Sequence, residues 1–317
     1  MFNIVWTGGT FRYLRYFVCS LLANSDARFR FVLNGCTPES AAMMRRFAEH
    51  HAGRVVDVLE ASPKMEAHGV ALDFVYGAVD DGEFFCFVDP DILATGPFVA
   101  DFAERLQGSC DAVSSGRGVW AETDVVPVGH RGVNGEYFFS QSGYVFGGPH
   151  FAMYRRAALQ ATRERWGVRF ASPGRDLSEA AMEQVASAGH DYLLYDTGKL
   201  VNILLQERGG TLCHFEHPAL MHIGGMSHYL SPPSYVVHEP GGEPEPDWSR
   251  WHGMATRYEV ARFTAAVLRS LTDAETPPAI PDGVEGDLVA RLERVRSELI
   301  ALVGRYGSAQ WCPPDEG

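Results

Sequence analysis

The stretch Phe85-Cys86-Phe87-Val88-Asp89-Pro90-Asp91-Ile92 joins a short apolar run to two aspartates that are separated by one residue. The apolar run is long enough for a buried strand, and alternating strand and helix patterns precede it. Such alternation predicts a sheet of mostly parallel strands. Ligands of open α/β sheets bind outside the carboxyl ends of the strands. We therefore expect Asp89 and Asp91 to lie at the ligand-binding edge of the sheet.

The aspartate pair has the chemistry of a cation site. Residues i and i+2 of an extended segment lie on the same side of the chain, so both carboxylates can approach one ion directly or through water. Mg²⁺ and Mn²⁺ favour carboxylate oxygens, and Mg²⁺ is often held by one or two carboxylates together with substrate phosphates. The alternative is a solvated acidic turn. We favour a metal site in an enzyme acting on a diphosphate substrate, with Asp89 binding the cofactor and Asp91 also needed for catalysis.

A histidine is the candidate third ligand. His222 ends the strand-like run Ala219-Leu220-Met221, and Ile223-Gly224-Gly225 then lets the backbone turn. Neutral imidazole is a good ligand for Mn²⁺ and a poorer one for Mg²⁺. The alternative is a histidine that is hydrogen-bonded at a sheet edge. His228 is a weaker candidate, six residues further on.

A third acidic residue is a candidate catalytic base. Asp196 follows the apolar run Tyr192-Leu193-Leu194-Tyr195 and precedes a segment with leucines at helical spacing. A carboxylate at a helix start can cap the helix, which stabilises it by about 1 kcal/mol. The functional alternative is a general base that removes a proton from an acceptor hydroxyl group. Both roles stay open at this point.

Glycine-containing segments are weaker candidates for cofactor binding. Thr7-Gly8-Gly9 closes the first predicted strand and can present backbone donors to a nucleotide, although it lacks the spacing of a dinucleotide-binding loop. Gly147 and Gly148 either let the backbone approach a sugar or form a turn. His130 and Arg131, in a polar loop, either meet an acceptor or are simply exposed.

The composition limits the classes of function. The chain has 317 residues and a formal net charge of -13, so it lacks the basic surplus that nonspecific nucleic-acid binding requires. No apolar run approaches the ~18 residues of a membrane span, and the first residues read as a strand rather than a signal peptide. The 6 cysteines form no CxxC pair, which argues against a zinc or redox motif. We expect a reducing, cytoplasmic location.

The expected elements form one α/β domain with a helical extension. We predict a catalytic domain over residues 1–228, with a nucleotide- and metal-binding half (1–114) and an acceptor half (115–228). A mobile loop (229–248) and C-terminal helices (249–304), able to mediate self-association, follow. The predicted strands are Phe2–Trp6, Phe29–Leu33, Val55–Leu59, Phe84–Val88, Ala112–Ser114, Thr211–Phe215 and Ala219–His222. The predicted helices are Phe11–Ala23, Pro38–His50, Val70–Ala78, Tyr154–Arg165, Glu179–Ala188, Asp196–Glu207, Ser249–Leu271 and Gly286–Val303.

The pattern over residues 1–228 resembles the DxD-containing glycosyltransferases of the GT-A fold. The residues that carry the resemblance are Thr7-Gly8-Gly9, Asp89-Pro90-Asp91, Gly147-Gly148, Asp196-Thr197-Gly198 and His222-Ile223-Gly224-Gly225. The resemblance implies a Rossmann-type, mostly parallel sheet, with Mn²⁺ or Mg²⁺ bridging the acidic pair and the diphosphate of a nucleotide-sugar donor, commonly a UDP-sugar. It also implies a hydroxylated acceptor, a glycan or a small molecule. Inverting members usually have Glu-Asp where this chain has Tyr195-Asp196.

Three other classes share parts of this pattern. A sugar-phosphate nucleotidyltransferase has the same layout and metal, but its basic glycine-rich loop is poorly matched by Thr7-Gly8-Gly9-Thr10-Phe11-Arg12. A haloacid-dehalogenase-like phosphatase carries its Asp-x-Asp on an early strand and needs a downstream lysine, for which this chain offers only Lys199. A nucleotide-sugar-binding protein without activity is the non-enzymatic alternative.

Overall fold

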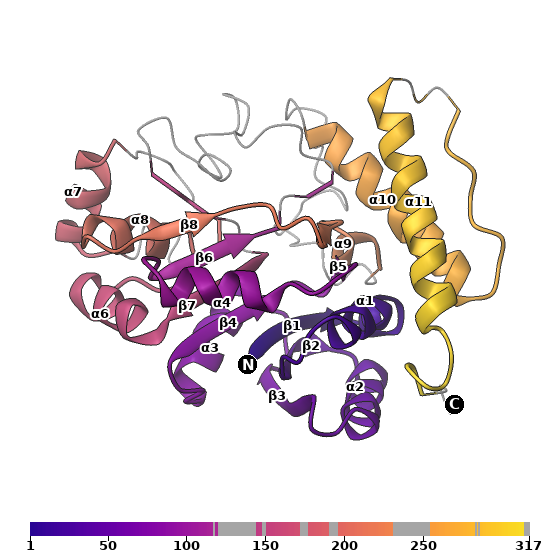
Figure 1. Ribbon diagram of the computed structural model, residues 1–317, viewed down its shortest axis with the longest axis horizontal. Helices are drawn as coiled ribbons and strands as arrows, with labels where there is room; N and C mark the ends of the chain where they lie inside the picture. The colour runs from indigo at the N-terminus through magenta and orange to yellow at the C-terminus, as the bar shows by residue number, and fades with distance from the viewer. Residues whose placement is uncertain are drawn as a thin grey trace.

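The computed structural model describes residues 1–116, 118–119, 144–147, 150–171, 177–189, 196–230, 254–282, 284 and 286–313. A seven-stranded sheet with the strand order β3-β2-β1-β4-β7-β6-β8 forms its centre, and β5 pairs with β9 in a separate two-stranded sheet (Figure 1). The strands are β1 (Phe2–Gly8), β2 (Phe29–Cys36), β3 (Val55–Ser62), β4 (Phe84–Val88), β5 (Ile92–Ala94), β6 (Ala112–Ser115), β7 (Phe151–Arg155), β8 (Leu212–His214) and β9 (Leu220–His222).

The described helices are α1 (Phe11–Ala23), α2 (Pro38–His50), α3 (His68–Ala78), α4 (Val99–Gln107), α6 (Arg156–Trp166), α7 (Glu179–Ser187), α8 (Lys199–Glu207), α9 (Ser227–Leu230), α10 (Met254–Thr272) and α11 (Asp287–Tyr306). Local signals explain some of these bounds. Helix α2 begins at Pro38, a residue whose fixed φ suits a first helical turn, and the Thr37 side chain accepts a hydrogen bond from the Ser40 N–H.

The sheet is mostly parallel, as the sequence predicts. Strands β1, β2, β3 and β4 run parallel, and β8 runs parallel to β6. Strand β7 is antiparallel to both of its neighbours, β4 and β6. The prediction of a helix from Tyr154 is therefore wrong at its start, because Tyr154 and Arg155 belong to β7 and the helix begins at Arg156. Pairing with two strands outweighs the helical pattern of the following residues.

Alternating residues of the strands bury both faces of the sheet. Phe2, Ile4 and Trp6 pack with one apolar cluster, to which α1, α2, α4, α10 and α11 contribute. Val5, Phe85 and Phe87 pack with a second cluster, to which α3, α6, α7 and α8 contribute. This two-faced burial explains why β4 reads as a continuous apolar run.

The C-terminal helices lie beside α1. Helices α10 and α11 pack against each other and against α1, and Figure 1 shows them together at one side of the molecule. Of the segment predicted as a mobile loop, residues 231–248 lie outside the described residues, whereas Tyr229 and Leu230 belong to α9. Among the described helices, none combines the length and apolar character of a membrane span.

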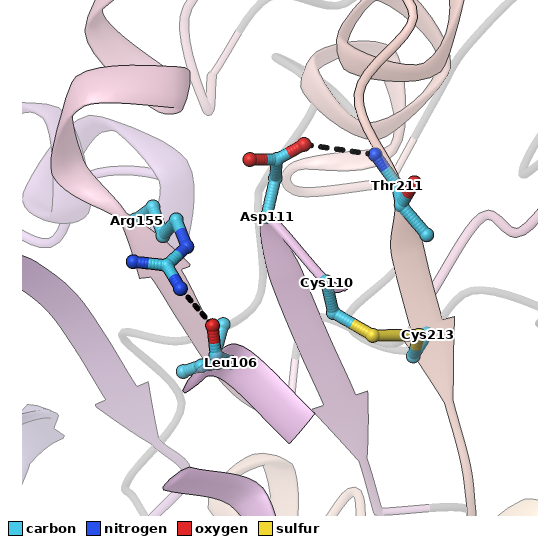
Figure 2. The surroundings of a disulfide bond; sticks show 6 residues. All are labelled: Leu106, Cys110, Asp111, Arg155, Thr211 and Cys213. Atoms are coloured by element: carbon cyan, nitrogen blue, oxygen red, sulfur yellow. Dashed lines mark hydrogen bonds between the residues drawn. A yellow bond between two sulfur atoms is a disulfide. The ribbon is translucent and has the colours of Figure 1, made fainter. Parts of the chain in front are cut away.

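A disulfide joins Cys110, just before β6, to Cys213 in β8 (Figure 2). The two strands are neighbours, and the Asp111 carboxylate also accepts a hydrogen bond from the Thr211 N–H at 3.0 Å. Disulfides are typical of oxidising compartments. The disulfide therefore counts against the reducing compartment that we expected from the scattered cysteines.

Candidate metal centre

The two-stranded sheet brings Asp91 and His222 together. Strand β5 starts directly after Asp91, and its antiparallel pairing with β9 sets Ile92 opposite His222. The Ile223 N–H then donates to the Asp91 carbonyl oxygen at 3.1 Å. As a result the Nε2 atom of His222 lies 3.3 Å from Asp91 Oδ1 and 3.9 Å from Asp89 Oδ2. Residues 131 positions apart thus share one site, as the sequence analysis expected of this acidic pair and this histidine.

A second histidine, His150, completes the centre. Because β7 runs antiparallel to β4, its amino end lies beside the carboxyl end of β4, where Val88 pairs with Phe151. The Asp89 N–H donates to the His150 carbonyl oxygen at 2.6 Å, and the His150 Nδ1 atom lies 3.2 Å from Asp89 Oδ2. His150 was not among the candidate residues, because β7 was not predicted from the sequence. The useful signal is a histidine directly ahead of a short apolar run.

The centre offers a second possible ligand set beside the expected one, which stays a prediction. Ligand atoms of Asp89, His150 and His222 all lie within 4.8 Å of one another. Divalent ions lie about 2.0–2.2 Å from such ligand atoms, so small side-chain shifts bring the three atoms onto one ion. The expected set was Asp89, Asp91 and His222. Asp91 is buried, with 4% of its surface exposed, and its carboxylate contacts the His222 ring through Nε2.

The hydrogen bonds of His222 fit a cation in front of its Nε2 atom. Its Nδ1 atom lies 2.7 Å from the carbonyl oxygen of Gly116, which can only accept, so we assign the proton to Nδ1. In the neutral ring, Nε2 then presents a lone pair toward the two carboxylates. That arrangement is favourable only with a second proton on Nε2 or with a cation between these groups. A histidine whose other nitrogen donates to a carbonyl is a common form of metal ligand.

Burial and charge shift the pKa values of the centre in different directions. Burial raises the pKa of Asp89 to about 7; the charge of His68 opposes this shift, and that of Asp91 adds to it. Burial also favours the neutral form of Asp91, but His222, His150 and the Met226 N–H outweigh it and lower its pKa. For His222, burial lowers the pKa, yet Asp91 and Asp89 outweigh it and the net shift is upward. The raised pKa values of Asp89 and His222 mean that a cation bound here would compete with protons.

These shifts predict how the melting temperature in chelator, and the increase that Mn²⁺ produces, change with pH. A group whose pKa is raised in the folded state stabilises the fold while it is protonated, and this stabilisation is lost as the pH rises. For Asp89 the loss falls between about pH 4 and pH 7, and for His222 it begins above the ordinary pKa of histidine. The melting temperature measured in chelator should therefore fall from about pH 5.5 to about pH 8. The rise in melting temperature produced by Mn²⁺ should grow over the same interval, because fewer protons compete. A Mn²⁺ effect that shrinks as pH rises would contradict this assignment of protons.

The charge of Asp196 acts on Asp89, and its side chain caps no helix. Helix α8 begins at Lys199, and Gly198, with φ +77°, occupies the capping position, so the prediction of a helix starting at Asp196 is wrong by three residues. The Asp196 side chain is exposed and accepts from the Thr197 N–H at 2.8 Å. Its charge contributes to the raised pKa of Asp89. An exposed carboxylate in electrostatic reach of Asp89 keeps the role of a base open and removes the helix-cap alternative.

The segment Thr7-Gly8-Gly9 lies at the carboxyl end of β1, next to β4 and therefore on the same edge of the sheet as Asp89. The Thr7 carbonyl oxygen accepts from the Thr10 N–H and hydroxyl group, which closes a turn. The Gly8 carbonyl oxygen accepts from the Thr37 N–H at 3.0 Å. The position suits a nucleotide contact, which remains a prediction.

Gly147 is required by packing. Its φ is +62°, and an added Cβ would lie 2.7 Å from Ser114 Oγ and 3.0 Å from Asn202 Nδ2. Ser114 is fully buried in β6 and lies 2.8 Å from His214 Nδ1, so it has little freedom to move. Gly147 therefore lets the chain pass close to β6 and α8.

We expect Gly147→Ala to reduce the free energy of unfolding by roughly 2–4 kcal/mol, because strain at positive φ adds to overpacking. Denaturant unfolding measures this change. Gly9→Ala is the matched control, since an added Cβ there meets no atom within 4 Å. The control should change stability by less than about 1 kcal/mol. Equal stability of the two variants would contradict the packing role.

Other candidates cannot be placed. Gly148, His130 and Arg131 lie outside the described residues, as does the side chain of His228. His68, at the start of α3, was not a candidate, although its Nε2 atom lies 3.9 Å from Asp89 Oδ1. Its imidazole is partly exposed and adds a basic group at the edge of the centre.

No protein-family model and no curated protein matches the chain. Similar solved structures include glycosyltransferases. The galactosyltransferase LgtC, in complex with donor and acceptor sugar analogs, has 13% identity and a TM-score of 0.43, with 88% of this chain and 98% of that chain covered. The mannosyltransferase PcManGT from Pyrobaculum calidifontis, in complex with GDP-Man and Mn²⁺, has 13% identity and a TM-score of 0.46, with 96% and 76% covered.

A third similar structure belongs to another class of enzyme. The 4-diphosphocytidyl-2C-methyl-D-erythritol synthase from Anaerococcus prevotii has 10% identity and a TM-score of 0.40, with 68% of this chain and 86% of that chain covered. At these identities and TM-scores the similarities assign no activity to this chain. The assignment of function depends on the residues of the centre.

Proposed function

We propose that this protein is a metal-dependent glycosyltransferase of the GT-A type. It would transfer a sugar from a nucleotide-diphosphate sugar, most simply a UDP-sugar, to a hydroxyl group of a glycan or small-molecule acceptor. The observation that carries the proposal is the convergence of two carboxylates and two imidazoles at the carboxyl end of β4. This is the edge at which an α/β sheet binds its ligands.

The residues of the centre would have different roles in binding the cation. Asp89, His150 and His222 would hold the cation. Asp91 would orient His222 through its contact with Nε2, while the Gly116 carbonyl oxygen fixes the ring from the other side. Outer partners of this kind commonly change metal affinity 10–100-fold. Two imidazoles in the set favour Mn²⁺ over Mg²⁺, because Mg²⁺ prefers oxygen ligands.

The reaction needs positive charge at this place. Departure of the nucleoside diphosphate leaves negative charge on its phosphates, and the bound cation supplies electrostatic stabilisation for it. Thr7-Gly8-Gly9 would contact the nucleotide from the neighbouring strand β1. Asp196 would take the proton from the acceptor hydroxyl group, since its carboxylate is exposed and its charge acts on Asp89.

A thermal-shift screen of nucleotide sugars, with and without Mn²⁺, tests the proposal. A ligand at 100 times its Kd stabilises the native state by about 2.7 kcal/mol, which raises the melting temperature by roughly 4 °C for a chain of this size. We expect such a shift for one nucleotide sugar, and only with Mn²⁺ present. Shifts that appear equally in chelator would contradict the metal-dependent proposal.

Product analysis separates the remaining alternatives. Sugar transfer to an acceptor with release of a nucleoside diphosphate supports the proposal. Release of pyrophosphate from a nucleoside triphosphate and a sugar phosphate would identify a nucleotidyltransferase instead. Donor binding without turnover on any acceptor would identify a binding protein.

The proposed partners follow from charge and fold. A net charge of -13 opposes nonspecific nucleic-acid binding. We propose that α10 and α11 could mediate self-association of the chain. The disulfide between Cys110 and Cys213 opposes a cytoplasmic location, so we do not propose one.

A further inference from the structure

Two cysteines from opposite ends of the sequence face each other beside α1. Cys19 lies in the middle of α1 and is fully buried, and Cys312, in the segment after α11, is 4% exposed. Their Sγ atoms are 3.6 Å apart, and 293 positions separate the two residues in the chain. The sulfurs are therefore in van der Waals contact, about 1.6 Å further apart than in a disulfide.

Contacts other than the sulfurs position the end of the chain. His51 Nε2 lies 2.7 Å from the Trp311 carbonyl oxygen, and His50 Nε2 lies 2.8 Å from that of Gln310. The Cys312 N–H donates to the Ser308 carbonyl oxygen at 2.9 Å. The ring of Trp311 also packs edge-on against Tyr306 of α11. The terminal segment is thus held against α1 and α2, and it carries Cys312 to Cys19 without needing a covalent bond.

The redox setting of this pair is indicated by the first disulfide. Cys110 and Cys213 are joined in the same chain, and disulfides are typical of oxidising compartments. Cys36 is a useful contrast, because its Sγ donates to the Trp6 carbonyl oxygen at 3.1 Å and serves packing in β2.

We propose that Cys19 and Cys312 are a second disulfide site, which fastens the C-terminal end of the chain to α1. The bond would close a loop that contains nearly the whole fold, including the first disulfide. Its stabilising effect in the chain-entropy description grows with loop length, so this pair would limit the unfolded chain more than Cys110–Cys213 does.

The oxidant is a low-molecular-weight disulfide such as oxidised glutathione. When the terminal segment detaches, the thiolate of Cys312 attacks this disulfide, forms a mixed disulfide and releases one thiol. The segment then docks again, and the thiolate of Cys19 attacks the Cys312 sulfur, releasing the second thiol. Two protein thiols thus lose two electrons and two protons, and one disulfide becomes two thiols. Burial raises the pKa of Cys19, so we expect this exchange to be slow in the docked state.

Peptide mapping of the full natural chain tests the proposal without any variant. The folded protein is incubated in a buffer of reduced and oxidised glutathione, alkylated with iodoacetamide after unfolding, and digested without reduction. We expect two linked peptide pairs, Cys19 with Cys312 and Cys110 with Cys213. Recovery of alkylated Cys19 and Cys312 beside a linked Cys110–Cys213 pair would overturn the proposal.

The melting temperature of the oxidised chain tests the fastening role. We expect Cys312→Ser, treated in the same buffer, to melt about 5–10 °C below the natural chain. Cys36→Ser is the matched control and should keep the linked Cys19–Cys312 pair. Equal melting temperatures of the oxidised natural chain and Cys312→Ser would contradict the role of the bond in holding the terminal segment.

Discussion

Asp91→Asn is expected to abolish metal-dependent sugar transfer and to leave the fold intact. The amide keeps the size of the side chain but removes the negative charge that faces His222 Nε2 at 3.3 Å. His222 then loses the partner that raises its pKa and orients its ring. The variant both weakens the orientation of the His222 ring and removes one negative charge from the centre. We therefore expect turnover with Mn²⁺ to fall by at least about 10²-fold. The measurement is the initial rate of transfer at saturating Mn²⁺.

The control for this variant is Asp26→Asn, which removes an exposed carboxylate before β2. It should keep the natural rate, because a surface charge of this kind contributes little. The circular dichroism spectrum of Asp91→Asn should match that of the natural chain, so that loss of rate is separated from loss of fold. Full activity of a folded Asp91→Asn protein would remove the central assignment.

The second large effect is expected at Asp196. As a general base, its carboxylate would take the proton from the acceptor hydroxyl group, a role that typically contributes 10²–10⁴-fold. We therefore expect Asp196→Asn to lower kcat by roughly 10²–10⁴-fold while the Kd of the donor changes little. The side chain is exposed and caps no helix, so the fold should tolerate the change. Single-turnover kinetics and donor binding give the two values.

A pH profile distinguishes a base from a residue that only supports the site. The natural enzyme should lose activity at low pH as its base becomes protonated, and Asp196→Asn should lack that acidic limb. Unchanged kcat in Asp196→Asn would show that the proton goes elsewhere. Weaker donor binding at unchanged kcat would assign Asp196 to the binding of the donor.

Local patterns were sufficient for much of the amino-terminal half. The bounds of α1, α2 and β4 agree with the predicted Phe11–Ala23, Pro38–His50 and Phe84–Val88. These elements bury a continuous face or run, and α2 has both a proline at its first position and a threonine cap. The aspartate pair was found for the same reason, since it ends a strand that is buried on both faces. Sequence and tertiary packing agree at these positions.

The centre itself depends on pairing that the sequence does not reveal. Strand β5 has three residues and was not predicted, yet its pairing with β9 is what sets His222 beside Asp91. Strand β7 was assigned in part to a helix, so His150 had no predicted place. Short strands gain their stability from neighbours far away in sequence, and a local pattern carries little information about them.

The disulfide was missed for a related reason. Cys110 and Cys213 are 103 residues apart, and only the parallel pairing of β6 and β8 brings them together. Their spacing matches no short motif, so counting cysteines favoured free thiols. Cysteine spacing along the sequence therefore does not reveal pairs that strand pairing brings together.

Calorimetric titration of Mn²⁺ into chelator-treated, desalted protein tests the central claim most directly. The account predicts one site in the natural chain, with affinity that weakens at least about 10-fold in His150→Ala and in His222→Ala. His50→Ala, which removes an exposed imidazole at the end of α2 whose Nε2 atom contacts the Gln310 carbonyl oxygen, should bind as the natural chain does. Absence of Mn²⁺ binding by the natural chain, or binding that is the same in all three histidine variants, would contradict it.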